Sequence, residues 1–118
     1  MLVSIFHNPR CSKSRAAMAA LEEHGIDAET VLYLDAPPTA VELAEVIGKL
    51  GIEAKALIRF GESRAKELGI SVADERSAMA WITLMVENPI LIERPIVITA
   101  DKAAIGRPLE RVLDLFDL

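Results

Sequence analysis

Cysteine is nearly absent from this chain, and its single copy, Cys11, raises the main question about function. One cysteine forms no internal disulfide, so neither the disulfide framework of a secreted domain nor a Cys-x-x-Cys redox pair is available. Histidine is also scarce. With only His7 and His24, a structural zinc site lacks ligands unless carboxylates supply them. We therefore expect no metal site.

Long apolar runs and excess basic charge are missing as well. The longest mostly apolar stretch, Ala78 to Val86, is far shorter than the roughly 20 residues that a membrane span requires. Residues Met1 to Arg10 lack the basic start and apolar stretch of a secretory signal. The formal net charge of -5 disfavours a general nucleic-acid surface, because phosphate backbones bind mainly to excess Lys and Arg. We expect a cytoplasmic protein that binds neither membranes nor nucleic acids.

The first third of the chain predicts a strand, a helix and a second strand. Residues Leu2 to Phe6 form a short apolar run that indicates a buried strand. Good helix formers follow from Ser14 to His24, so a helix begins at or just after Cys11. Residues Val31 to Leu34 predict the second strand. The crossover between these strands makes them parallel.

The whole chain has 118 residues, a length typical of one domain, so we predict a single domain over residues 1–118. Thr39 and Glu42 match a capping box, and helical propensity continues through Ile52 to Asn88 as a helical insertion in the middle third. A β-branched run, Ile96 to Thr99, is expected to form a hairpin with Ala103 to Gly106, and a last helix covers Leu109 to Phe116. This order predicts an α/β, thioredoxin-like fold: a mixed sheet of about four strands flanked by helices.

The position of Cys11 favours chemistry over packing. A lone cysteine is most often a small buried hydrophobe. Cys11, however, lies in a polar loop just before a helix, and Arg10, Lys13 and Arg15 lie within four residues of it. Free N–H groups at a helix start, the helix dipole and nearby cations stabilise a thiolate, and the same N–H groups bind anions. The alternative is an inert thiol beside a solvated basic loop.

Neighbouring side chains allow two interpretations each. On one interpretation Ser12 and Ser14 are helix caps. On the other, their hydroxyls donate hydrogen bonds to the thiolate or to a bound oxyanion. His7 is either a packed residue without a chemical role or a residue that raises the positive potential around Cys11. A cysteine phosphatase loop is excluded, because it needs arginine six residues after the cysteine and this chain has Ala17 there. Any anion must be held by arginines from elsewhere in the sequence.

The segment from His7 to Arg15 contains Asn-Pro-Arg-Cys-Ser-Lys-Ser-Arg and resembles the start of the glutaredoxin-dependent arsenate reductases, especially their short bacterial members. Later segments resemble the same family in the same order. They are Val31 to Leu34 before Pro37-Pro38, Ala56 to Arg59, Asn88 to Thr99, and Gly106 to Leu109. The resemblance therefore spans almost the whole chain.

The resemblance implies a set of site residues. Cys11 is the catalytic cysteine, and Arg59, Arg94 and Arg107 bind the substrate. Guanidinium groups hold tetrahedral oxyanions through paired donors and keep their charge, although each arginine taken singly is equally well a surface or helix-end cation. The family also implies a cis peptide before Pro95, facing the cysteine, although only about 5% of X-Pro bonds are cis.

The implied activity is reduction of As(V) to As(III) through a thiol-arsenate ester on Cys11, with His7 and Ser14 in supporting roles. Because the chain has no second cysteine, the resemblance implies glutathione as co-substrate and glutaredoxin as partner, with no bound cofactor. Two alternatives remain open. One is a redox-sensing transcription regulator that binds RNA polymerase, although such regulators typically use a Cys-x-x-Cys switch. The other is a glutathione-linked thiol oxidoreductase with another substrate.

Overall fold

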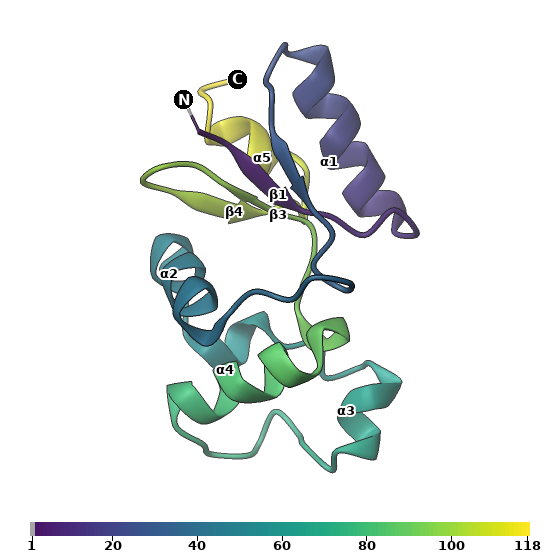
Figure 1. The fold of residues 1–118 in the computed structure, drawn as a ribbon, viewed down its shortest axis with the longest axis vertical. Coiled ribbons are helices and arrows are strands. Elements are labelled where there is room, and N and C mark those ends of the chain that lie inside the picture. Colours follow the sequence, from purple (N-terminus) through teal and green to yellow (C-terminus); the bar gives the residue numbers. More distant parts are fainter. Residues whose placement is uncertain (1) are drawn as a thin grey trace. The chain divides into compact units, whose positions relative to one another are not determined.

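The computed structural model describes residues 2–118 and separates them into two compact units (Figure 1). The sheet unit combines the chain up to Ala36 with Arg94–Leu118, and the helical unit is Pro37–Glu93. None of the helices within residues 2–118 is long and apolar enough to cross a membrane.

The sheet unit contains one mixed four-stranded sheet, in the order β2-β1-β3-β4. Strand β1 pairs with β2 in parallel, whereas β3 runs antiparallel to both β1 and β4. Its elements are β1 (Ser4–Phe6), α1 (Ser12–Glu23), β2 (Glu29–Val31), β3 (Ile96–Ile98), β4 (Ala103–Ile105) and α5 (Glu110–Asp114). The predicted mixed sheet, the parallel first pair and the hairpin after residue 96 are confirmed.

One face of this sheet packs against α1 and α5. Alternate residues of a strand point to the same face, so Val3 and Ile5 lie side by side there, and Val97 pairs directly with Ile5. Ala17 of α1 and Val112 of α5 are fully buried against them. The small alanine side chain lets α1 lie close to the sheet, and this packing fixes the start of α1 beyond the end of β1.

The second strand is present, but its predicted bounds, Val31 to Leu34, are wrong, because the strand is Glu29–Val31. The carbonyl of Leu32 accepts hydrogen bonds from two later N–H groups, at 3.0 and 2.9 Å, and so closes a turn. Tyr33 lies in this turn, is 1% exposed, and stacks on Phe6 with ring centroids 6.0 Å apart. The apolar composition there reflects burial within a turn.

The helical unit confirms the predicted insertion in the middle third of the chain. It consists of α2 (Ala40–Leu50), η1 (Ala54–Leu57), α3 (Ser63–Glu67), α4 (Ala78–Glu87) and η2 (Pro89–Leu91). The capping box is present in both directions: the Thr39 hydroxyl accepts from the Glu42 N–H at 3.1 Å, and the Glu42 carboxylate accepts from the Thr39 N–H at 3.0 Å. Helix α4 begins after Ser77, whose hydroxyl accepts a hydrogen bond from the Ala80 N–H at 3.1 Å and so caps the helix.

Gly106 offers a test of the packing at the end of β4. A Cβ atom at this position would lie 2.7 Å from Cγ of Pro95, closer than atoms can approach, and the Gly106 N–H donates to the Pro95 carbonyl at 2.9 Å. We expect Gly106→Ala to lower the free energy of unfolding by about 1–3 kcal/mol, measured by urea denaturation.

The matched control is Gly48→Ala in α2, where an added Cβ meets nothing within 4 Å. We expect that variant to be about 0.5–1 kcal/mol more stable than the wild type, because alanine is the better helix former. Equal stabilities for Gly106→Ala and the wild type would contradict the close approach to Pro95.

Candidate active site

Cys11 is the N-cap residue of α1, with extended backbone angles of φ -97° and ψ 122°. Its own N–H donates to the Asn8 carbonyl at 3.0 Å, which closes the loop after β1. The residue is 8% exposed. At an N-cap the side chain faces the free N–H groups of the first helical turn, so the sulfur lies in the environment that the sequence predicted.

The pKa of Cys11 is lowered below its ordinary value. Burial raises this pKa, but the backbone N–H groups of Ser14 and Lys13 and the positive charges of Arg94 and Arg107 lower it by more. The net direction raises the thiolate fraction of Cys11 at any given pH, and the thiolate is the nucleophilic form of cysteine. The role of Cys11 as a nucleophile stays a prediction.

Arg107 and Arg94 form a connected pair beside the sulfur. Nη2 of Arg107 lies 3.6 Å from Sγ of Cys11, and Nε of Arg107 donates to the carbonyl of Arg94 at 2.7 Å. Both arginines are half-buried. The hydrogen bond from Nε to the Arg94 carbonyl orients the Arg107 guanidinium group, so that its Nη2 is directed at the sulfur.

Strand register explains why residues so distant in sequence meet here. Phe6, the last residue of β1, pairs with Ile96, the first of β3, and Ile96 pairs with Ile105, the last of β4. The loop to Cys11, the residues before β3 and the residues after β4 therefore share one end of the sheet. This places both arginines at the start of α1.

The Arg94-Pro95 peptide bond is cis, as predicted. The Arg107-Pro108 bond is also cis, and this was not predicted. Gly106, against Pro95, was likewise missed as a site residue. The repeated Arg-Pro dipeptide, each copy next to a strand of the hairpin, is the one signal in the sequence that links these two positions.

Ser14 holds the loop together and does not cap the helix. Its side chain is fully buried, and its hydroxyl oxygen accepts from the Asn8 N–H at 3.0 Å and lies 2.6 Å from Nδ1 of His7. Helix α1 begins at Ser12, so neither serine occupies the cap position. The backbone N–H of Ser14, and not its hydroxyl, stabilises the sulfur.

His7 is the second partner in this loop. Burial and then the charge of Arg15 lower its pKa, so the neutral imidazole is favoured at neutral pH. A neutral ring adds no positive potential beside Cys11. The structure therefore favours the interpretation of His7 as a packed, hydrogen-bonded residue that supports the loop through Ser14.

Arg59 lies in the helical unit, just beyond η1. Its Nη1 forms an ion pair with Glu62 at 3.0 Å and donates to the carbonyl of Ile90 at 3.3 Å. The backbone N–H of Arg59 donates to the carbonyl of Leu91 at 2.8 Å. The structure thus brings together Cys11, Arg94 and Arg107 within the sheet unit. The assignment of Arg59 to the substrate stays a prediction.

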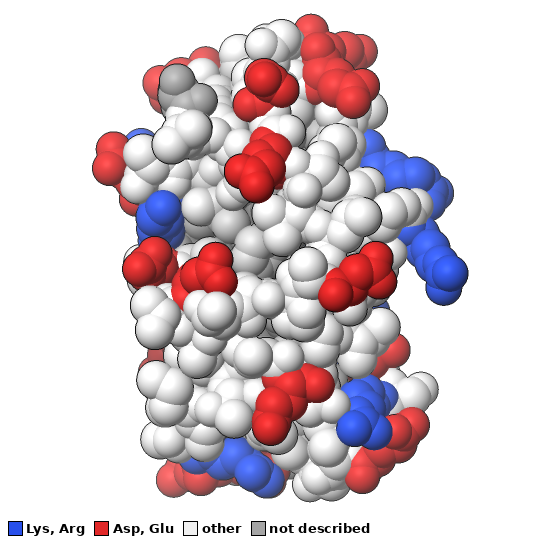
Figure 2. Space-filling view, in the orientation of Figure 1, with Lys and Arg blue, Asp and Glu red and all other residues white. Residues whose placement is uncertain are grey.

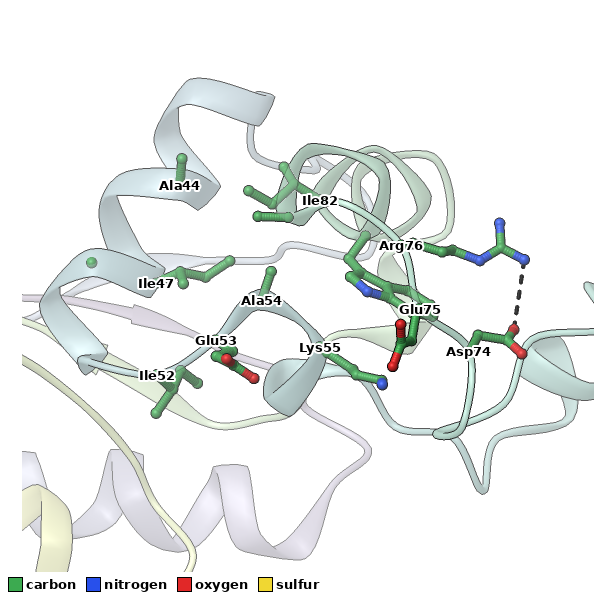
Figure 3. Close-up of a pocket in the computed structure, with 13 residues that line it drawn as sticks. Ala44, Ile47, Ile52, Glu53, Ala54, Lys55, Asp74, Glu75, Arg76 and Ile82 are labelled. Atoms are coloured by element: carbon green, nitrogen blue, oxygen red, sulfur yellow. Dashed lines mark ion pairs between the residues drawn. The ribbon is translucent and has the colours of Figure 1, made fainter.

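The helical unit also contains a pocket of about 630 Å³ (Figure 3). Ile47, Ile82 and Trp81 supply apolar walls, and Arg76 pairs with Asp74 at 3.6 Å near one side. No cysteine, histidine or serine lines it, and neither does any predicted site residue. Within residues 2–118, no three His, Cys, Asp or Glu side chains are grouped as metal ligands.

A mixed four-stranded sheet, with a cysteine at the start of the first helix and a cis-proline just before β3, defines a thioredoxin-like protein. Within that class, comparison with known families is specific. The chain belongs to the ArsC family, whose model matches residues 6–115. The resemblance in the sequence is confirmed.

Individual relatives agree with this assignment. An arsenate reductase of Neisseria meningitidis serogroup A is 48% identical over 111 residues, which cover 93% of this chain and 94% of the relative. An Escherichia coli arsenate reductase is 38% identical over 113 residues, 96% of this chain and 79% of the relative. The solved arsenate reductase from Vibrio cholerae has a TM-score of 0.90 at 43% identity and covers 97% of each chain.

The contribution of Arg107 to the thiolate is testable by alkylation. We expect Arg107→Gln to raise the pKa of Cys11, because a positive charge that favours the anion is lost. At pH 7 a smaller fraction of the thiol is then ionised, so the neutral reagent iodoacetamide reacts several-fold more slowly. The rate is measured from pH 5 to 10.

Arg111→Gln on α5 is the control, because it removes an exposed cation from the same unit. It should leave the profile unchanged. In the wild type the inflection should fall below the value of about 8.5 for free cysteine. Identical profiles for Arg107→Gln and the wild type would contradict the electrostatic role of Arg107.

Ser14→Ala separates a structural role from a catalytic one. It leaves the Asn8 N–H and His7 without their buried partner, so we expect a loss of about 1–3 kcal/mol in unfolding free energy. The backbone N–H at residue 14 remains, so the alkylation profile of Cys11 should not move. Ser12→Ala, at an exposed position, should stay within about 0.5 kcal/mol of the wild type. A shifted profile at unchanged stability would show that the Ser14 hydroxyl acts on the sulfur.

Proposed function

We propose that this chain is an arsenate reductase that uses the Cys11 thiolate as nucleophile. The observation that carries the proposal is the guanidinium Nη2 of Arg107 at 3.6 Å from a sulfur whose pKa is lowered. Family membership supports it, as do the relatives named arsenate reductases. A thiolate next to a fixed anion-binding group suits an oxyanion substrate.

In the first step the Cys11 thiolate attacks arsenic, and a new S–As bond forms as one protonated arsenate oxygen leaves as hydroxide, which a proton from solvent converts to water. The substrate is an anion at neutral pH, so it must be held against a negatively charged nucleophile. Arg107 and Arg94 supply the opposing charge, and the free N–H groups at the start of α1 supply further donors. Prepositioned donors of this kind stabilise charge as it develops in the transition state.

In the second step an external thiol must act, because Cys11 is the only cysteine. We propose glutathione: its sulfur bonds to the Cys11 sulfur while the S–As bond breaks and its electron pair stays on arsenic. As(V) becomes As(III), arsenite is released, and the thiol proton is taken up by arsenite. Both sulfurs are oxidised to a mixed disulfide, which a glutaredoxin then reduces with a further glutathione by thiol-disulfide exchange.

A coupled assay tests the reaction. NADPH oxidation is followed with arsenate, glutathione, glutaredoxin and glutathione reductase. We expect Cys11→Ser to abolish turnover, since serine has no comparable nucleophile, and Arg94→Ala or Arg107→Ala to lower kcat/KM about a hundredfold through loss of an anion-stabilising group.

Arg111→Ala should match the wild type in the same assay, because it removes an exposed cation remote from the sulfur in sequence. Arg59→Ala tests the substrate-binding role that the resemblance implies for Arg59. A raised KM for arsenate would support that role, and an unchanged KM would contradict it. Full turnover in Cys11→Ser would end the proposal.

A further inference from the structure

Three exposed cations surround Cys11 in sequence: Arg10, Lys13 and Arg15. The Arg15 side chain donates to the carbonyl of Pro9 at 2.9 Å and so belongs to the loop. Within residues 2–118 no ion pair engages any of the three with a carboxylate. The loop therefore presents uncompensated positive charge to solvent beside the thiol.

This charge stands out against the rest of the chain, whose formal net charge is -5. Helix α1 has no acidic residue in its first turn, and its acidic pair, Glu22 and Glu23, lies at the opposite end. Figure 2 shows blue side chains projecting from the edge where Figure 1 places the start of α1, with red side chains gathered toward the other end of that helix. A local positive potential in an acidic protein attracts and orients anions.

The exposed cations differ from those at the sulfur. Arg107 is half-buried and fixed by its bond to the Arg94 carbonyl, which suits a small anion bound directly at Sγ. Arg10 and Lys13 are exposed, and no hydrogen bond to another residue of the described range 2–118 holds their side chains. We call Arg10 and Lys13 the rim cations. Exposed cations of this kind suit the outer charges of a larger ligand whose reactive atom reaches Cys11.

We propose that Arg10 and Lys13 bind the carboxylates of glutathione and so guide its sulfur to Cys11. The inference rests on the proposed function, which needs an external thiol because the chain has a single cysteine. Glutathione carries one carboxylate on its glycine and another, beside an ammonium group, on its γ-glutamyl residue, with its thiol between them. Arg10 and Lys13, one on each side of Cys11 in sequence, are opposite in charge to these two carboxylates.

The test uses thiol-disulfide exchange without arsenate. The Cys11 thiolate attacks oxidised glutathione, one S–S bond breaks, a mixed disulfide forms, and a glutathione thiolate leaves. The second-order rate constant is measured by intact mass for the wild type and for Arg10→Gln/Lys13→Gln. Hydroxyethyl disulfide, which is neutral, serves as the parallel probe. The double variant should react about tenfold more slowly with oxidised glutathione and at the wild-type rate with hydroxyethyl disulfide.

Two controls make the result specific. Lys102→Gln/Arg111→Gln removes the same charge from exposed positions elsewhere in the sheet unit and should leave both rates unchanged. In the wild type, high salt should lower the rate with oxidised glutathione relative to the rate with hydroxyethyl disulfide, because salt screens exposed charges. Together these results would support carboxylate binding by the rim.

Other outcomes overturn the proposal. Equal slowing with both disulfides would mean that the rim only sets the thiolate fraction, and equal slowing in the control variant would mean that only net charge matters. An unchanged rate with oxidised glutathione, with slowing confined to reduction by glutaredoxin, would assign the rim to a protein partner. None of these readouts needs arsenate, so the proposed function stands or falls separately.

Discussion

The proposed reaction depends on keeping a negative charge on a nearly buried sulfur. Burial alone works against the thiolate at Cys11, because a charge loses solvation in the protein interior. The N–H groups of the first turn of α1 and the guanidinium groups of Arg94 and Arg107 reverse this balance. The same groups also suit an incoming oxyanion. In the proposed mechanism, activation of the nucleophile and binding of the substrate therefore have one physical origin.

The sheet makes this arrangement rigid. Residues at the ends of β1, β3 and β4 lie in register, so three loops converge at one point. Gly106 lets the end of β4 approach Pro95 closely, and the Arg94 carbonyl receives Nε of Arg107. The arginine at the sulfur is thus held by backbone from the hairpin itself. Beneath the loop, the buried hydroxyl of Ser14 holds the Asn8 backbone and His7 in place.

Cations occur at two depths in the sheet unit. Arg94 and Arg107 are half-buried, where electrostatic interactions are stronger than in water and geometry is fixed. Arg10 and Lys13 are exposed, where charge acts mainly on encounter and is screened by salt. In the proposed mechanism the half-buried cations serve the chemical step on a small anion, and the exposed cations recruit a larger charged thiol. Both tasks are assigned to one sulfur because the chain has a single cysteine.

Local signals in the sequence determined the helix start at Cys11, the capping box of Thr39 and Glu42, and the order of strands and helices, because caps and periodicity act within a few residues. The same local view misplaced the second strand, since Tyr33 is buried by a turn stacked on Phe6. Only the tertiary structure decided that Arg107 meets Cys11, 96 positions away. Strand register sets that distance, and register emerges from packing of the whole sheet.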